Sequence, residues 1–170
     1  GHDFPDPNIP KAAPYGVYDI TANKGWVSVG ISSDTAEFAV ASIHRWWIKV
    51  GKKKYPKAKK VFITADSGGS NSSRSRLWKH ELQKLSNKYK LAIHVSHFPP
   101  GTSKWNHIEH KMFSYISINW KCTPLTDYNV VVNLIGNTKT KTGLEIMAAL
   151  DNNNYQKGVK ISDAEFEAIK

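Results

Sequence analysis

The stretch VFITAD, residues 61–66, decides the fold class of this 170-residue chain. It is short and almost entirely apolar, and it ends in a carboxylate, Asp66. Runs of this kind are typical of strands that are buried on both faces in the centre of an α/β sheet. Residues 67–71, SGGSN, have the composition of a loop, and apolar residues at helical spacing predict a helix from about Ser72. The local pattern is therefore a buried strand, a loop and a helix, with Asp66 at the carboxyl end of the strand.

Hydrophobic periodicity predicts the other elements. Alternating apolar residues indicate strands, and apolar residues three or four positions apart indicate helices. The N-terminal part is predicted to be an antiparallel hairpin of strands 15–20 and 26–31 around a turn at 23–25, then a helix that is capped by Asp34 and ended by Gly51, then a basic loop over 52–60. After the strand at 61–66 and its helix, the pattern predicts a strand over 91–97 and a helix from about 103 to 120. The C-terminal part is predicted to hold a short helix near 127–135, either a strand or a helix over 143–150, and a terminal helix that starts with a capping box at 162–165. This order predicts an α/β fold with a mixed sheet, an antiparallel hairpin plus parallel strands, flanked by helices.

The stretch HFPPGTSKWNHIEH, residues 97–110, places a carboxylate in an unusual position. Two prolines and a glycine form a stiff loop that leads into the predicted helix. On that helix Glu109 falls on the same face as Trp105, Ile108 and Met112. Burial of a lone carboxylate ion among apolar side chains is costly. We therefore expect Glu109 to face a cation, a metal ion or a water-filled site.

The charge of the chain is strongly positive and unevenly distributed. The net charge is +10 with a pI of about 9.6, and the window His44–Lys90 holds 14 Lys and Arg against two acids. One of those acids, Glu81, is expected to pair with Lys84 or Lys88 on its own helix. A basic stripe of this density favours a polyanionic partner, above all nucleic acid, although a highly charged stretch also keeps a protein surface soluble.

Composition also excludes several classes of protein. No apolar run approaches the roughly 20 residues of a membrane span, so we expect no membrane contact. Cys122 is the single cysteine, so there is no disulfide framework and no zinc site of several cysteines. No signal peptide is visible. These features predict a cytoplasmic protein.

Three carboxylates stand out among the 14 acidic residues. Asp19 lies inside a predicted strand, where Asp is disfavoured; Asp66 ends a buried strand; Glu109 lies on an apolar helix face. Their convergence at the carboxyl edge of the sheet would make a site of oxygen ligands for two Mg²⁺ or Mn²⁺ ions, suited to phosphodiester chemistry. Each acid also has an ordinary interpretation: Asp19 bonded within a turn, Asp66 as a loop acid, and Glu109 paired with Arg74 or Arg76.

The residues around these acids resemble a known family. The blocks that carry the resemblance are YGVYDIT, DTAEFAVASIHRWW, ITADSGGSNSSRSRLWK, HFPPGTSKWNHIEHKMFS, PLTDYNVVVNLI, KTGLEI and VKISDAEFEAI. In this order they resemble the catalytic domain of bacterial insertion-sequence transposases of the DDE superfamily, of the ISAzo-type branch. The resemblance covers nearly the whole chain and implies an RNase H-like fold.

The resemblance implies that Asp19, Asp66 and Glu109 form the acidic triad that holds two Mg²⁺ ions. It further implies hydrolysis at transposon ends followed by attack of the freed 3′-OH on target DNA, with double-stranded DNA as partner, action as a dimer or larger assembly, and a site-specific DNA-binding domain upstream that this chain lacks. Two other functions remain open: an RNase H-like nuclease or resolvase that only hydrolyses, and an inactive DNA-binding relic.

Domain boundaries follow from the same reading. Residues 1–14, with four prolines, are predicted to be an extended arm or linker. The RNase H-like core is predicted over 15–122, and a C-terminal extension that packs on the core over 123–170. One strand that is usual in this fold, before the first helix, is not readable in the sequence.

Several basic and polar residues are candidate DNA contacts. Arg74, Arg76, Lys79 and Lys104 flank the two acidic loops. Asn71 ends a loop whose backbone N–H groups are suited to bind phosphate. In related transposases the position seven after Glu109 is often basic; here it is Ile116, and Lys104 and Lys111 are the nearest substitutes.

Four histidines, His94, His97, His107 and His110, form a pattern that looks like a zinc site. Geometry argues against zinc, because His107 lies about 160° from Glu109 around the predicted helix. His94 and His97 also alternate to opposite faces of a strand. We expect His97 and His107 to lie near the DNA backbone instead.

Overall fold

The computed structural model describes residues 13–32, 34–66, 69–99, 108, 112, 128–138 and 143–169. The chain divides into two compact units, and each is built from two separate segments. Residues 1–32 and 107–154 form the first unit, and residues 33–106 and 155–170 form the second. Each unit is described by itself.

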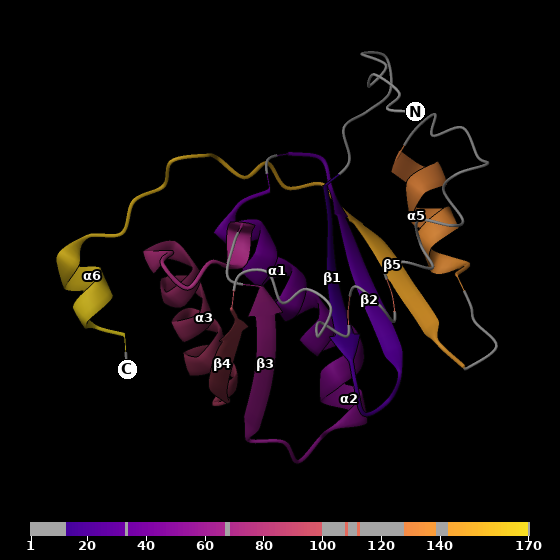
Figure 1. Cartoon of the computed structure of the whole chain (residues 1–170), viewed down its shortest axis with the longest axis horizontal. Helices are drawn as coiled ribbons and strands as arrows, with labels where there is room; N and C mark the ends of the chain where they lie inside the picture. Colours follow the sequence, from indigo (N-terminus) through magenta and orange to yellow (C-terminus); the bar gives the residue numbers. More distant parts are fainter. Residues whose placement is uncertain are drawn as a thin grey trace. The chain divides into compact units, whose positions relative to one another are not determined.

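The first unit contains a three-stranded mixed sheet in the order β1-β2-β5. Strand β1 (Ala13–Asp19) pairs antiparallel with β2 (Lys24–Gly30), which confirms the predicted hairpin. Asn23 closes the turn with a positive φ of 52°. Strand β5 (Glu145–Asp151) lies parallel to β2 on its other side (Figure 1), so the stretch that the sequence left undecided is a strand.

The strand beside β2 comes from an unexpected part of the chain. The described residues between β2 and the next helix form a bend, and the outer edge of β2 is covered by β5 instead. In this register Trp26 lies opposite Met147. The sequence predicted no strand for the position beside β2. That position is occupied by β5, a parallel strand more than 100 residues further along the chain.

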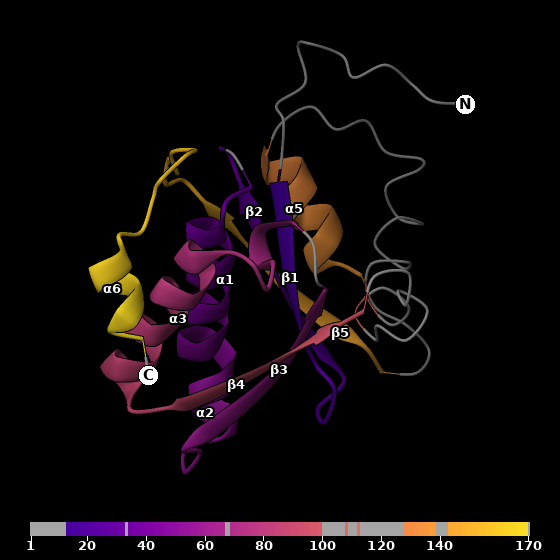
Figure 2. The same cartoon turned by 60° about the vertical axis from the view of Figure 1, so that its left-hand side comes forward.

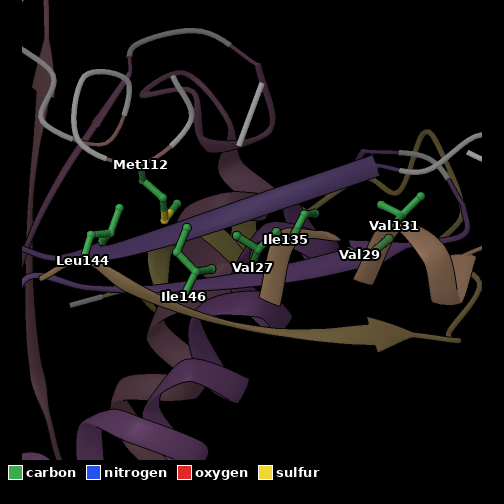
Figure 3. Close-up of a cluster of buried hydrophobic side chains, with 7 residues drawn as sticks. All are labelled: Val27, Val29, Met112, Val131, Ile135, Leu144 and Ile146. Atoms are coloured by element: carbon green, nitrogen blue, oxygen red, sulfur yellow. The ribbon is translucent and has the colours of Figure 1, made fainter. Parts of the chain in front are cut away.

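The core of the first unit lies between its sheet and helix α5 (Tyr128–Gly136). Figure 3 shows side chains from β2, β5 and α5 pointing toward one another. The buried members of this cluster are Val27, Val29, Met112, Val131, Ile135, Leu144 and Ile146. The short helix predicted near 127–135 is therefore confirmed, and its apolar face closes the core.

The second unit combines two parallel strands with helices. Its elements in chain order are α1 (Ala36–Trp46), the π-helical turn η1 (Trp47–Gly51), α2 (Lys52–Lys54), β3 (Lys60–Asp66), the 3-10 turn η2 (Gly69–Asn71), α3 (Arg76–Tyr89), β4 (Ala92–Phe98) and α6 (Asp163–Glu167). Strands β3 and β4 pair in parallel, and α1 packs against α3 (Figure 2). The two units together confirm a mixed α/β fold with antiparallel and parallel strands flanked by helices.

Two predicted limits of the first helix are wrong. The N-cap of α1 is Thr35, whose hydroxyl accepts a hydrogen bond from the Phe38 N–H at 3.2 Å, and not Asp34. Gly51 does not end the helical path, which continues to Lys54. A Cβ at Gly51 would lie 2.7 Å from the Trp47 ring. This glycine is therefore needed for close packing and not for a stop.

The burial predicted for the strand at 61–66 is also wrong. Ala65 is its one buried residue, and Phe62 is 70% exposed. Burial alternates along β3, because the described helices of this unit lie on one face of the β3–β4 pair (Figure 2). The apolar sequence of β3 therefore led to a prediction of more burial than the strand has.

Helix α3 begins later than predicted but buries the expected face. Its N-cap is Ser75, whose hydroxyl accepts from the Trp78 N–H at 3.1 Å. The side chains of Trp78, Leu82 and Leu85 are buried. Glu81 pairs with Lys84 at 3.3 Å, one of the two partners predicted for it.

The terminal helix α6 has the predicted capping box. The Ser162 hydroxyl accepts from the Glu165 N–H at 3.2 Å, and the Glu165 carboxylate accepts from the Ser162 N–H at 3.2 Å. These bonds from Ser162 lower the pKa of Glu165. Among the described residues, none of the helices is long and apolar enough to cross a membrane.

Acid should destabilise the second unit through His44. This half-buried ring bonds the Tyr89 hydroxyl at 2.6 Å, and burial, with Lys88 and Arg45 nearby, lowers its pKa. The unfolded chain therefore takes up a proton near pH 6.5 that the folded state resists, so stability is lost as pH falls below about 6.5. Thermal unfolding midpoints should drop between pH 7.5 and pH 5.

The matched variants are His44→Gln and His94→Gln, because His94 is an exposed histidine in the same unit. The acid-induced drop should shrink in His44→Gln and persist in His94→Gln. An equal drop in all three proteins would show that His44 is not responsible.

Candidate active site

Asp66 lies at the edge where the two parallel strands of the second unit end. In the register of β3 and β4, Asp66 is opposite Phe98 and Ala65 is opposite His97. We call this end of the two strands the carboxyl edge. Asp66 is exposed there and His97 is half-buried. The prediction that Asp66 ends a strand is confirmed. The carboxyl ends of parallel strands are the usual ligand-binding edge of α/β sheets.

The start of helix α3 lies at the same edge. The chain leaves β3 at Asp66, passes through η2 and returns along α3 to the beginning of β4, so α3 starts near the end of β3 (Figure 2). Arg74 and Arg76 are exposed at this start. Asn71 closes η2, where the Ser72 N–H donates to the Gly69 carbonyl at 3.2 Å. Two exposed cations thus lie at the start of the helix that follows Asp66 in the chain.

Two of the predicted phosphate contacts are in contact with α6. Arg76 Nη1 donates to Asp163 Oδ1 at 2.6 Å, and its guanidinium carbon lies 4.6 Å from the centre of the Phe166 ring. Lys79 Nζ lies 5.6 Å from the same ring centre. Exposed contacts of this kind are each worth about 1 kcal/mol or less. A phosphate would therefore compete for Arg76 at little cost.

A third contact extends this surface, since His80 Nε2 lies 3.8 Å from Glu165 Oε2. Helix α6 thus presents two acids and an aromatic ring to the basic face of α3. The sequence predicted the helix but not its place. The acidic residues of α6 are complementary in charge to the basic residues of α3, and this complementarity was the sequence signal that α6 contacts α3.

Asp19 ends strand β1 in the first unit. Its Oδ1 accepts a hydrogen bond from the Ala22 N–H at 3.1 Å, within the hairpin turn. Its negative charge, after burial, raises the pKa of Tyr18. The turn interpretation of Asp19 is therefore correct for this oxygen. A carboxylate has about four acceptor sites, so a bonded turn and a metal ligand are compatible.

A lysine that sequence reasoning missed lies opposite Asp19. Lys24 is the cross-strand partner of Asp19 on one side and of Glu145 on the other. Its Nζ donates to Glu145 Oε2 at 2.6 Å. Cross-strand partners share one face of a sheet, so the three side chains form a row of alternating charge. The sequence did not show this row, because it left the 143–150 stretch undecided.

Four of the predicted site residues, Glu109, Lys104, Lys111 and His107, lie outside the described residues. Two neighbours of Glu109 in sequence are described. Met112 is fully buried in the core of the first unit, and Ile108 packs against that core. A Cβ at Gly25 would collide with the Met112 sulfur. The packing of Ile108 and Met112 on this core agrees with the apolar face predicted for these two positions.

Over residues 1–170 the sequence matches the family described as the Rhodopirellula transposase DDE domain. The chain belongs to this DDE transposase family. No curated protein and no solved structure gives a significant match. For a DDE transposase domain the substrate is DNA, the chemistry is in general metal-dependent polynucleotidyl transfer, and the mixed α/β fold is consistent with an RNase H-like core.

The three predicted acids are not all placed relative to one another. Asp66 belongs to the second unit, Asp19 belongs to the first, and Glu109 is outside the described residues. Within the part of the DDE transposase domain that the structure describes, no three His, Cys, Asp or Glu side chains form a metal-binding group. The convergence of the triad stays a prediction.

Proposed function

We propose that this chain is the catalytic core of a DNA transposase that hydrolyses a phosphodiester bond at each transposon end and then joins the freed 3′-OH to target DNA. The observation that carries the proposal is Asp66, exposed at the carboxyl edge, with exposed Arg74 and Arg76 at the start of the helix that follows it in the chain. A carboxylate at a strand end, followed by a helix whose start carries exposed cations, suits a negatively charged phosphodiester and the ions that accompany it.

The proposed catalytic residues are Asp19, Asp66 and Glu109. Their oxygens are the donors that Mg²⁺ and Mn²⁺ prefer, and the exposure of Asp66 fits an ion that keeps several water ligands. When bound, two such ions would favour deprotonation of the attacking water or 3′-OH and stabilise the leaving oxygen. Because the chain as a whole is basic and repels cations, the negative charge of these carboxylates is needed to attract the metal ions.

Packing in the first unit supports a shared site for Asp19 and Glu109. Met112 and Ile108 pack on the core of the unit, and Tyr18, next to Asp19, packs against the same cluster. Gly25, which Met112 touches, is the cross-strand partner of Tyr18. Met112, three residues after Glu109 in sequence, therefore packs at the end of the hairpin where Asp19 lies.

Cationic residues of the second unit would hold the DNA backbone. Arg74 and Arg76, both exposed at the start of α3, would bind backbone phosphates near the reacting bond. Lys79, one turn further along α3, would also bind a phosphate once DNA has displaced α6 from the basic face of α3. The further proposed contacts are Asn71, His97, Lys104, Lys111 and His107. Action as a dimer, and end recognition by a separate upstream domain, belong to the same proposal.

The joining step distinguishes a transposase from a nuclease or a DNA-binding relic. A labelled duplex with the terminal sequence of the element and a 3′-OH end should, with Mn²⁺, become covalently joined to a target plasmid. A 3′-dideoxy end should not be joined, and a chelator should abolish the reaction. Cleavage without joining would assign the chain to hydrolysis only, and inactivity in both assays would favour a relic.

A further inference from the structure

Seven lysines gather at the end of the β3–β4 pair opposite to Asp66. Lys60 begins β3, the preceding lysines come from α2 and the loop after it, and Lys90 precedes β4. The backbone N–H of Ala92 donates to the Lys59 carbonyl at 2.8 Å, which joins the two groups. We call this set the lysine edge; its members, all exposed, are Lys52, Lys53, Lys54, Lys57, Lys59, Lys60 and Lys90.

The lysine edge lacks neutralising acids. Within the described part of the chain, none of its members forms an ion pair, whereas Arg76 and Lys84 each have an acidic partner. Between Glu37 and Glu81 the single acid is Asp66, at the other end of β3. Clustered like charges repel one another, so the lysine edge disfavours the folded state unless an external anion is bound.

Lys90 adds a backbone cost to this electrostatic one. It caps helix α3 in the left-handed conformation, with φ of 53°. Glycine is the usual residue at such a position because it has no Cβ to strain. The chain therefore places a cation at the lysine edge where a glycine would be more stable.

We propose that the lysine edge binds the phosphate backbone of duplex DNA at a second place, remote from the carboxyl edge. Strand β3 has seven residues, so its two ends are about 20 Å apart, or roughly six base pairs along a duplex. Duplex DNA is favoured over unpaired bases, because all the exposed side chains of the lysine edge are cations suited to phosphates. Tyr55, the aromatic residue within 52–60, is half-buried, and the exposed ring of Phe62 lies on β3, outside this set. The assignment of DNA as partner rests on the proposed function.

The test compares two double variants in binding assays with a chelator present, so that no cleavage is needed. Lys53→Gln/Lys54→Gln removes two charges from the lysine edge and keeps good helix formers in α2. Lys157→Gln/Lys160→Gln removes two exposed charges elsewhere in the same unit. Affinity for a 30-base-pair duplex is measured as a function of salt concentration.

Loss of two phosphate contacts should reduce the slope of log affinity against log salt by up to about 1.8, since each contact contributes about 0.9. The control variant should keep the wild-type slope, and Lys53→Arg/Lys54→Arg should restore it. An unchanged slope in the Gln variant, or an equal reduction in the control, overturns the proposal. A joining assay on the same proteins reports separately on the proposed function, so the two failures are distinguishable.

Discussion

Replacement of Asp66 by Asn should reduce metal-dependent cleavage of DNA by roughly 10³-fold or more. The amide keeps the size of the side chain but removes the negative charge that would hold a divalent cation at the carboxyl edge. DNA binding should remain or strengthen slightly, because the substitution removes one negative charge and so raises the net charge by one. Cleavage of an end duplex in Mn²⁺ and binding of the same duplex in a chelator measure the two effects.

Asp34→Asn is the matched control for this experiment. Asp34 is an exposed aspartate in the same unit, and Thr35, not Asp34, caps helix α1. The control should cleave at the wild-type rate. If Asp66→Asn cleaved as well as Asp34→Asn, the carboxyl edge would not be the catalytic site.

Replacement of Met112 by Ala should lower the free energy of unfolding by about 2–5 kcal/mol. Met112 is fully buried, and its sulfur fills the space left by the missing side chain of Gly25. Truncation leaves a cavity in the core of the first unit, beside the hairpin whose first strand ends at Asp19. Cleavage should also fall, because Met112 is three residues from Glu109, a proposed catalytic residue. Chemical denaturation measures the first effect.

The chain supplies its own control in Met147, its second methionine, which is 53% exposed on β5. Met147→Ala should cost less than about 1 kcal/mol. Similar losses in the two variants would contradict the core that we describe for the first unit.

Local signals predicted much of the fold. The turn at Asn23 and the alternation on either side of it specify the hairpin, and the spacing of Trp78, Leu82 and Leu85 specifies the buried face of α3. Errors arose where two neighbouring residues had the same capacity, as with Asp34 and Thr35 at the α1 cap. Gly51 was misread because close packing against tryptophan, not helix termination, requires it.

Contacts between distant segments were beyond prediction. Asp66 was correctly placed because a strand end is a local feature. The pairing of Lys24 with Glu145, and of Arg76 with Asp163, depends on where β5 and α6 dock, which no local pattern specifies. The alternating burial of β3 likewise depends on which faces other elements cover.

The pairing of β2 with β5 has a consequence for how the protein is made. Lys24 and Glu145 are 121 residues apart, and a ribosome that adds about 5–20 residues per second needs roughly 6–24 s to reach the second after the first. During that time one edge of β2 in the hairpin has no partner strand. In the folded protein, residues 25–30 of β2 are buried. Exposed apolar edges recruit other strands, so nascent chains of this protein are candidates for chaperone capture. A message cut before the codon for Glu145 would leave that edge open permanently.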